Sequence, residues 1–235
     1  PELFYQDKNC SIHGILRRKV SHPHPWCIPY ANIYRRMGYN VLLADLRGHG
    51  ESEGGHTDWG IHDVEDMNAW VSLLRSKNPQ MQIGFHGVSL GAAMALIYSA
   101  SDEGKQMKFY VADSSYGDLL DLGRDKLMKY TGDDRLVLGM DVLNPFFQAA
   151  LYMHTGKLLS DIDPVNRVQH MTSPVLFLHG AKDQLVPPEV AELLLADSSS
   201  TNKKLYIFQG ASHTMEMSAN GPAYREYVTD FIKNT

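Results

Sequence analysis

The sequence of 235 residues contains little cysteine and no excess of positive charge. Its two cysteines, Cys10 and Cys27, exclude a disulfide framework, although a single bridge is conceivable in an exported protein. Lys and Arg number 22 against 27 Asp and Glu, and the net charge of −5 provides no basic surface for nucleic acid or an anionic membrane. We therefore expect no nucleic-acid partner.

The sequence also shows no basic segment followed by an apolar stretch, which a secretory signal would require. It begins with Pro1 instead of Met, so we expect the natural N-terminus to lie upstream; a cytoplasmic location is favoured, and export stays open. The longest stretch without Asp, Glu, Lys or Arg, residues 78–101, is long enough for a membrane span but contains Pro79, His86 and three glycines. It predicts a buried strand followed by a helix, and no integral membrane segment.

Five short apolar runs recur along the sequence, with helical segments between them. They cover residues 41–45, 82–86, 109–113, 175–179 and 205–208. Their hydrophobicity is continuous rather than alternating, which is typical of strands covered on both faces. Helices are expected before, between and after them, over residues 26–37, 63–77, 188–196 and 224–233. The pattern predicts an α/β fold with a mostly parallel central sheet flanked by helices.

About sixty residues separate the third of these runs from the fourth, too many for one crossover helix. Helices are expected over 116–130 and 145–159, and we expect residues 115–165 to form a helical cap inserted into a single domain that spans residues 1–235. Such a cap would cover the carboxyl ends of the strands, where open α/β sheets bind ligands. The following side chains either line an acyl pocket or only pack the cap: Tyr116, Met140, Phe146, Phe147, Tyr152 and Met153.

The sharpest chemical signal is a serine between two glycines, Gly87-Val-Ser89-Leu-Gly91, directly after the expected strand 82–86. A serine on a strand-to-helix turn projects its hydroxyl above the sheet, and the glycines permit a close backbone approach. The helix that follows supplies free amides, so the backbone N–H of Leu90 is a candidate oxyanion donor. The motif predicts Ser89 as a catalytic nucleophile.

A serine nucleophile needs a base, and the base needs a carboxylate that orients it. Asp183 follows the fourth apolar run, and His213 follows the fifth. Both would emerge at the same edge of a parallel sheet as Ser89, in the chain order serine, acid, histidine. We therefore predict Asp183 and His213 as the catalytic partners of Ser89.

A second glycine-rich signature, Asp45-Leu-Arg47-Gly-His49-Gly, precedes these motifs. With it, the sequence from residue 29 onward resembles the α/β-hydrolases of the serine esterase, lipase and aminopeptidase-like type, particularly bacterial members described mainly as uncharacterised hydrolases. The resemblance implies the α/β-hydrolase fold and a Ser-His-Asp hydrolase without a cofactor. Members use this signature mainly to shape the loop beside the active site, so Arg47 and His49 are expected to be structural.

Ser89 argues against the dehalogenases and epoxide hydrolases of the same fold, which have Asp at that position. Charged residues in the expected cap, among them Lys126, Lys129 and Arg135, favour small or medium soluble esters over lipids. We therefore predict a carboxylesterase whose partner is a small-molecule ester or acyl substrate. A peptidase, a monoacylglycerol-type lipase and a non-catalytic binding module that retains the fold stay open as alternatives.

Two further clusters are weak candidates for chemistry. His22 and His24 have side chains that ligate zinc, but two prolines hold this segment extended, so no metal site is expected. Asp113, Ser114 and Ser115 resemble an alternative serine site, but no pair of helix-opening glycines surrounds them.

The strand that should precede the first large helix is hard to find in this sequence. In hydrolases of this type it ends in His-Gly, and the loop after it donates the second oxyanion amide. Residues 17–25 have Val20 as their one aliphatic side chain, so they are not expected to form a central strand. His13-Gly14 is one candidate, with Ile15 as the donor.

We prefer to interpret residues 10–16 as an early antiparallel strand. The central strand, about fifteen residues with its loop, would then be missing between Arg18 and Ser21. This interpretation predicts that the Cα atoms of Lys19 and Val20 lie farther apart than the ~3.8 Å of bonded neighbours.

Overall fold

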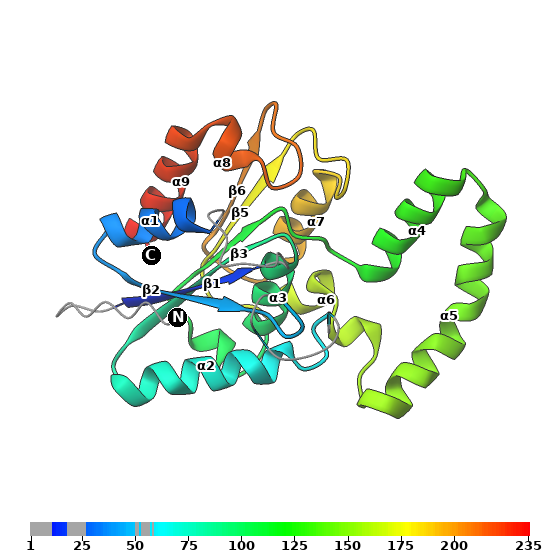
Figure 1. The fold of residues 1–235 in the computed structure, drawn as a ribbon, viewed down its shortest axis with the longest axis horizontal. Helices are drawn as coiled ribbons and strands as arrows, with labels where there is room; N and C mark the ends of the chain where they lie inside the picture. Colours follow the sequence, from blue (N-terminus) through cyan, green and yellow to red (C-terminus); the bar gives the residue numbers. More distant parts are fainter. Residues whose placement is uncertain (1–10, 18–26, 50–51, 53–56, 58) are drawn as a thin grey trace.

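A computed structural model describes the chain apart from residues 1–10, 18–26, 50–51, 53–56 and 58. In the described part, six strands form one sheet in the order β2-β1-β3-β4-β5-β6, and every neighbouring pair is parallel. The strands are β1 (Ser11–Arg17), β2 (Asn40–Asp45), β3 (Gln82–Val88), β4 (Tyr110–Asp113), β5 (Val175–Gly180) and β6 (Lys203–Phe208). The sheet runs through the middle of the molecule (Figure 1).

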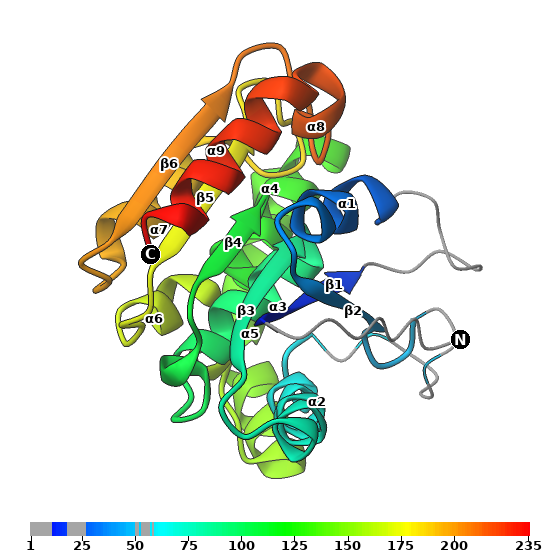
Figure 2. The same ribbon diagram turned by 90° about the vertical axis from the view of Figure 1, so that its left-hand side faces the viewer.

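Helices cover both faces of this sheet. On one face lie α1 (Ile28–Arg36) and α9 (Gly221–Lys233); on the other lie α2 (Asp63–Lys77), α3 (Leu90–Ser99), α6 (Pro164–Val168) and α7 (Glu189–Asp197). Figure 1 shows α1 and α9 above the sheet and α2 below it, and Figure 2 shows α1 beside α9 from a second direction. The short helix α8 (Glu216–Ala219) precedes α9. The predicted α/β architecture is confirmed.

The two faces arise from the alternation of side chains along each strand. In β5, Val175 and Phe177 pack into the core beneath α3, whereas Leu176 and Leu178 pack into the core beneath α1 and α9. All four are at most 1% exposed. Because both faces of the strand are covered, its hydrophobicity is continuous in the sequence, as expected for a buried parallel strand.

Strand β1 corrects the expected antiparallel strand over residues 10–16. It lies between β2 and β3 and is parallel to both, with Ile15 opposite Leu43 on one side and His86 on the other. A strand that is followed by a helix and a neighbouring strand closes a parallel crossover, so β1 has the direction of β2. The central strand is therefore present, and Ile15 lies within it rather than in a loop. The expected gap between Lys19 and Val20 lies outside the described residues.

Between β4 and α6 the chain forms two helices, α4 (Leu119–Thr131) and α5 (Asp134–Thr155), which stand to one side of the sheet (Figure 1). The expectation of a helix starting at Pro145 was wrong, because α5 continues through that residue. Proline is common in the first turn of a helix, which misled the sequence argument. Inside a helix it removes one backbone hydrogen bond, and an exposed helix tolerates this with a local bend.

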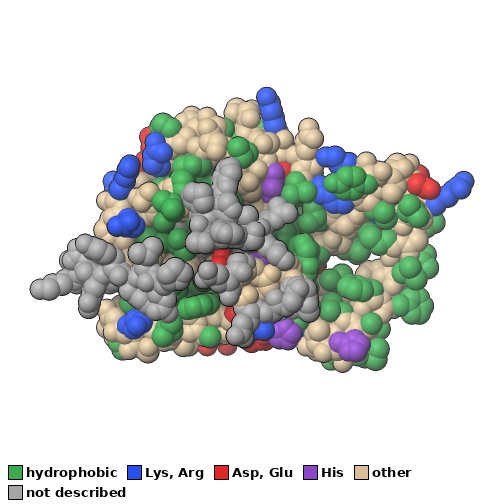
Figure 3. Space-filling view, in the orientation of Figure 1, with side chains coloured by type: hydrophobic (Ala, Val, Ile, Leu, Met, Phe, Trp, Pro, Cys, Tyr) green, Lys and Arg blue, Asp and Glu red, His purple; other side chains and the backbone are tan. Residues whose placement is uncertain are grey.

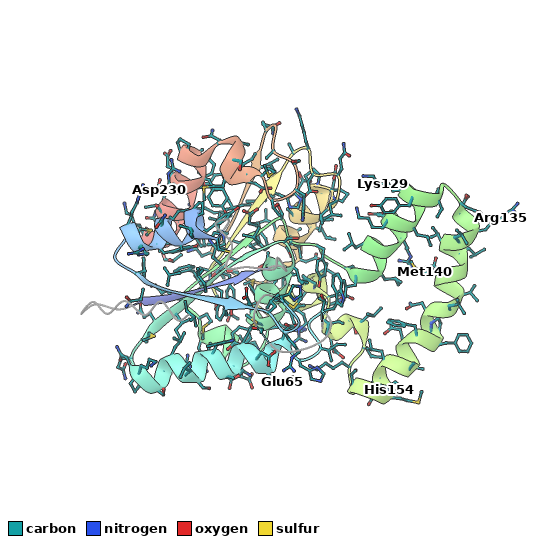
Figure 4. All side chains as sticks on the ribbon, viewed as in Figure 1. Glu65, Lys129, Arg135, Met140, His154 and Asp230 are labelled. Atoms are coloured by element: carbon teal, nitrogen blue, oxygen red, sulfur yellow. The ribbon has the colours of Figure 1, made fainter. Side chains whose placement is uncertain are left out.

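Neither α4 nor α5 contains a buried residue. The two helices pack on each other, and Met140 lies on the side of α5 that faces α4 (Figure 4). Apolar side chains are exposed along α5, among them Phe146, Phe147, Tyr152 and Met153, and hydrophobic surface covers much of this lobe in Figure 3. These four therefore do not pack the interior of the lobe. By length and composition alone, α5 is the one helix in the described part that could cross a membrane, which is weak evidence for a span.

Candidate active site

Ser89 occupies a sharp turn between β3 and α3. Its φ of 55° and ψ of −119° lie in a region that L residues rarely adopt, and its amide donates to the carbonyl of Asp113 at 2.8 Å. As the first residue of α3, Leu90 has a backbone N–H without a partner inside the helix. The turn therefore combines a strained serine with a helix N-terminus that favours negative charge.

Gly87, which precedes this turn, is required because a side chain would not fit there. A Cβ on Gly87 would lie 2.1 Å from the carbonyl oxygen of Gly91 and 2.4 Å from the amide nitrogen of Ala92. Both are backbone atoms, so no side-chain rotation can relieve the clash. The motif therefore brings β3 into direct contact with the first turn of α3.

Ser89, His213 and Asp183 form a continuous hydrogen-bonded series. The hydroxyl of Ser89 lies 2.8 Å from Nε2 of His213, and Nδ1 of His213 lies 2.6 Å from Oδ2 of Asp183. An ionised carboxylate only accepts, so Nδ1 donates to Asp183 and Nε2 is left to accept the proton of Ser89. The three residues follow β3, β6 and β5 respectively, and thus meet at the carboxyl edge of the sheet.

The carboxylate of Asp183 is fully buried and held in an ionised state. Its Oδ1 accepts from the backbone amides of Leu185 and Val186 at 2.8 and 2.9 Å. Burial alone would raise the pKa of this carboxyl, but hydrogen bonds from His179, His213 and the Val186 amide hold the pKa well below its usual value.

His179, near the end of β5, is a neighbour of Asp183 that the sequence argument missed. Its Nε2 lies 2.9 Å from the carbonyl oxygen of Val186 and 3.3 Å from Oδ2 of Asp183. Burial lowers the pKa of His179, but its hydrogen bonds to Asp183 and to the Val186 carbonyl outweigh burial and raise it. His179 could have been found from its position in the sequence, one residue before the end of a buried strand that leads to Asp183.

A second group of polar side chains is buried beside these residues, and we call Asp113, Ser114 and Glu216 the acid cluster. All three are 0% exposed. The hydroxyl of Ser114 lies 3.2 Å from Oδ1 of Asp113 and 2.8 Å from Oε1 of Glu216. Ser114 is therefore inaccessible to substrate, which agrees with rejecting it as an alternative nucleophile.

Residues 46–49 of the glycine-rich signature follow β2 and are held by their own side chains. Arg47 makes two hydrogen bonds to the carboxylate of Asp66, at 2.6 and 2.9 Å. His49 is buried, and its Nδ1 lies 2.9 Å from the carbonyl oxygen of Arg47. Both contacts are internal to the loop and to α2, as a structural role requires.

Two expected features fall on parts of the chain that are not described. His22 and His24 lie there, and so does the loop after β1, where the second oxyanion amide is expected. Among the described residues, no three His, Cys, Asp or Glu side chains gather closely enough to hold a metal ion.

Comparison with known proteins connects this geometry to a family. The sequence profile of the prolyl oligopeptidase family matches residues 29–235. The uncharacterized protein YqkD of Bacillus subtilis is 31% identical over 208 residues, which are 88% of this chain and 66% of that protein. The lysophosphatidylserine lipase ABHD12 of Danio rerio is 26% identical over 170 residues, 72% of this chain and 42% of that protein. The chain thus spans less than two thirds of the length of these relatives.

Solved structures share the fold at low sequence identity. The esterase Pf2001 of Pyrococcus furiosus superposes with a TM-score of 0.74 at 24% identity, covering 96% of this chain and 82% of the other. A monoacylglycerol lipase of Paleococcus ferrophilus gives a TM-score of 0.66 at 17% identity, with 95% of each chain covered. The sheet and its helices therefore have the α/β-hydrolase arrangement.

Proposed function

Because the chain belongs to the prolyl oligopeptidase family and is an α/β-hydrolase, we propose that it cleaves carboxylic esters of small or medium acyl groups through an acyl-enzyme on Ser89. The observation that carries the proposal is the unbroken series from Ser89 through His213 to the buried carboxylate of Asp183. A serine aligned in this way on a base, with the base aligned on an anion, is the arrangement that nucleophilic acyl transfer requires.

In the proposed reaction, Nε2 of His213 removes the hydroxyl proton as Oγ of Ser89 attacks the acyl carbonyl. Asp183 keeps the proton of His213 on Nδ1 and stabilises the imidazolium that forms. The Leu90 amide donates to the developing oxyanion at the N-terminus of α3. His213 then protonates the leaving alcohol, and water hydrolyses the acyl-enzyme by the same proton transfers in reverse.

We also propose that residues 115–165 act as a cap at this site. Lys126 on α4 donates to the carbonyl of Leu185 at 2.8 Å, and Lys129 donates to the carbonyl of Gln184 at 3.3 Å. These carbonyls belong to the segment directly after Asp183. The contacts tie α4 to the loop of the proposed orienting acid, which supports a cap that borders the substrate.

Replacement of Ser89 by Ala tests the reaction. We expect at least a 10³-fold loss of kcat for p-nitrophenyl acetate and butyrate, because the bond-forming atom is removed. A fluorophosphonate probe should label the wild-type protein at Ser89 and leave the variant unlabelled. Ser115→Ala is the matched control, since its hydroxyl is buried and donates to the carbonyl of Tyr116.

Turnover that survives in Ser89→Ala would contradict the proposed nucleophile. Absence of both turnover and labelling in the folded wild-type protein would favour a non-catalytic binding module.

The family itself favours a second candidate, a peptidase. Acetyl-peptide p-nitroanilides and p-nitrophenyl esters with the same acyl group distinguish the two activities, and we expect kcat/KM to be higher for the esters.

A further inference from the structure

The acid cluster lies directly between the two segments that bring Ser89 and His213 together. The carbonyl of Asp113 accepts the amide of Ser89 at 2.8 Å, and the hydroxyl of Ser114 accepts the amide of Thr214 at 3.2 Å. Thr214 follows His213 and has a φ of 62°, so the backbone there is held in a conformation that L residues rarely adopt. The side chains of the cluster therefore set where the His213 loop lies relative to Ser89.

The hydrogen bonds of the cluster favour an additional proton. The hydroxyl of Ser114 has one hydrogen but lies within hydrogen-bond distance of two carboxyl oxygens, on Asp113 and on Glu216. It can donate to one of them. The other carboxyl then receives no full hydrogen bond from Ser114, and a proton on that carboxyl would supply the missing hydrogen.

The surroundings of the cluster supply neutral hydrogen bonds. Tyr224 donates to Oδ2 of Asp113 at 2.7 Å and lies 3.1 Å from Nε2 of His86, whose Nδ1 lies 2.6 Å from the hydroxyl of Tyr34. Burial lowers the pKa of His86 to about 3, so this ring is neutral. Within the described part of the chain, neither Asp113 nor Glu216 forms an ion pair with Lys or Arg.

Two ionised carboxylates at this depth would repel each other without a compensating cation. One shared proton leaves a single negative charge, which the hydroxyls of Ser114 and Tyr224 can solvate. Burial and the neighbouring Glu216 both raise the pKa of Asp113 well above its usual value, in agreement with this count.

We propose that Asp113 and Glu216 share one proton and, through Ser114, position the loop of His213 over Ser89, so that loss of this proton at alkaline pH limits catalysis. The proposal rests on the proposed function, because it concerns the placement of the catalytic base. Asp113 and Glu216 are positioning residues and do not touch the substrate.

The direction of the pH effect follows from the charges. Below the pH at which the shared proton is lost, the cluster has one negative charge and the loop is held. Above it, the cluster has a second negative charge, and repulsion between Asp113 and Glu216 displaces α8, which begins three positions after His213.

The other titratable groups that face the cluster come from four elements and from the loop itself: Tyr30 and Tyr34 on α1, His86 on β3, His179 on β5, Tyr224 on α9 and His213. Burial raises the pKa of each of the three tyrosines, so they stay neutral over the alkaline range in which the shared proton is lost. The pKa of His86 lies far below this range.

Glu216→Gln tests the proposal, because an amide has the shape of a protonated carboxyl but does not ionise. We expect kcat for p-nitrophenyl butyrate at pH 7 to fall by about 2- to 5-fold. We expect the alkaline limb of kcat to move upward by at least ~1 pH unit, with KM little changed. Ser115→Ala, an equally buried neighbour outside the cluster, should retain the wild-type profile.

A second measurement remains informative if a variant folds poorly or if the protein lacks esterase activity. In Ser89→Ala, infrared difference spectra between neutral and alkaline pH should show the carbonyl band of a protonated carboxyl that disappears on titration. The band should be absent when Glu216→Gln is added. An unmoved alkaline limb, or no such band in the folded protein, would overturn the proposal, whereas a band without turnover would overturn only the proposed function.

Discussion

Ser89 and Gly87 show how one turn serves both packing and chemistry. A serine with a φ of 55° stores strain of roughly 1–3 kcal/mol, and the contact of β3 with α3 holds it there. The residue types that make this contact possible are local in the sequence, which is why the motif predicted the turn. Asp183 and His213 were predictable for a related reason, since each follows a buried strand of the same parallel sheet.

Gly87→Ala should break this turn. The added Cβ meets backbone atoms of Gly91 and Ala92 at 2.1–2.4 Å, so β3 and α3 must separate. We expect a loss of about 3 kcal/mol or more in the free energy of unfolding, measured by urea denaturation, and loss of fluorophosphonate labelling. Gly123→Ala is the control, because its nearest neighbour is the sulfur of Met140 at 3.8 Å. It should stabilise α4 by roughly 0.5–1 kcal/mol. Equal effects of the two changes would refute the steric argument.

The acid cluster could not be predicted from the sequence. Ser114 and Glu216 lie 102 positions apart, and neither belongs to a recurring pattern. From the sequence, Asp113-Ser114-Ser115 was interpreted as a weak candidate for a nucleophile site. The sequence alone does not distinguish a buried serine hydroxyl from an exposed one. Burial and proton sharing are properties of the assembled core.

At the scale of elements, continuous apolar runs predicted β2 through β6, whereas β1 was assigned the wrong direction. Composition says little about strand direction, which depends on the crossover that follows. The error at Pro145 has a similar origin. A proline is a common start signal for helices, and only the exposed position of α5 shows that a bend there is tolerated.

Helices α4 and α5 should be separable from the rest of the fold. Replacing residues 120–157 by a Gly/Ser linker of about ten residues should leave a folded protein, because the two helices contain no buried residue. We expect the melting temperature to change by less than ~5 °C, and short acetyl esters to be turned over. If the lobe is a cap, kcat/KM for longer acyl esters should fall more than for acetyl esters. Global unfolding of the linker variant would show that α4 and α5 belong to the core.

For the whole molecule, the two layers of helices bury acids whose pKa values move in opposite directions. Hydrogen bonds hold the pKa of Asp183 below its usual value, whereas burial raises the pKa of Asp113. The sequence has 27 Asp and Glu residues, and nothing in their spacing distinguishes these two from the others. Their opposite behaviour comes from their partners, which are amides and histidines for Asp183 and a second carboxyl for Asp113.

The two carboxyls should therefore contribute to the pH dependence of stability in opposite directions. The depressed pKa of Asp183 contributes stability above its unfolded value near ~4, and this is lost as pH falls through the folded value. The raised pKa of Asp113 contributes stability at low pH, and this is lost as pH rises through its folded value. Calorimetric melting temperatures from pH 3 to 10 in the Ser89→Ala background should show this. Adding Asp183→Asn should reduce the loss of stability as pH falls below ~4, and adding Asp113→Asn should reduce the loss of stability as pH rises above ~4. Parallel curves for all three proteins would mean that neither carboxyl has the partners described here in solution.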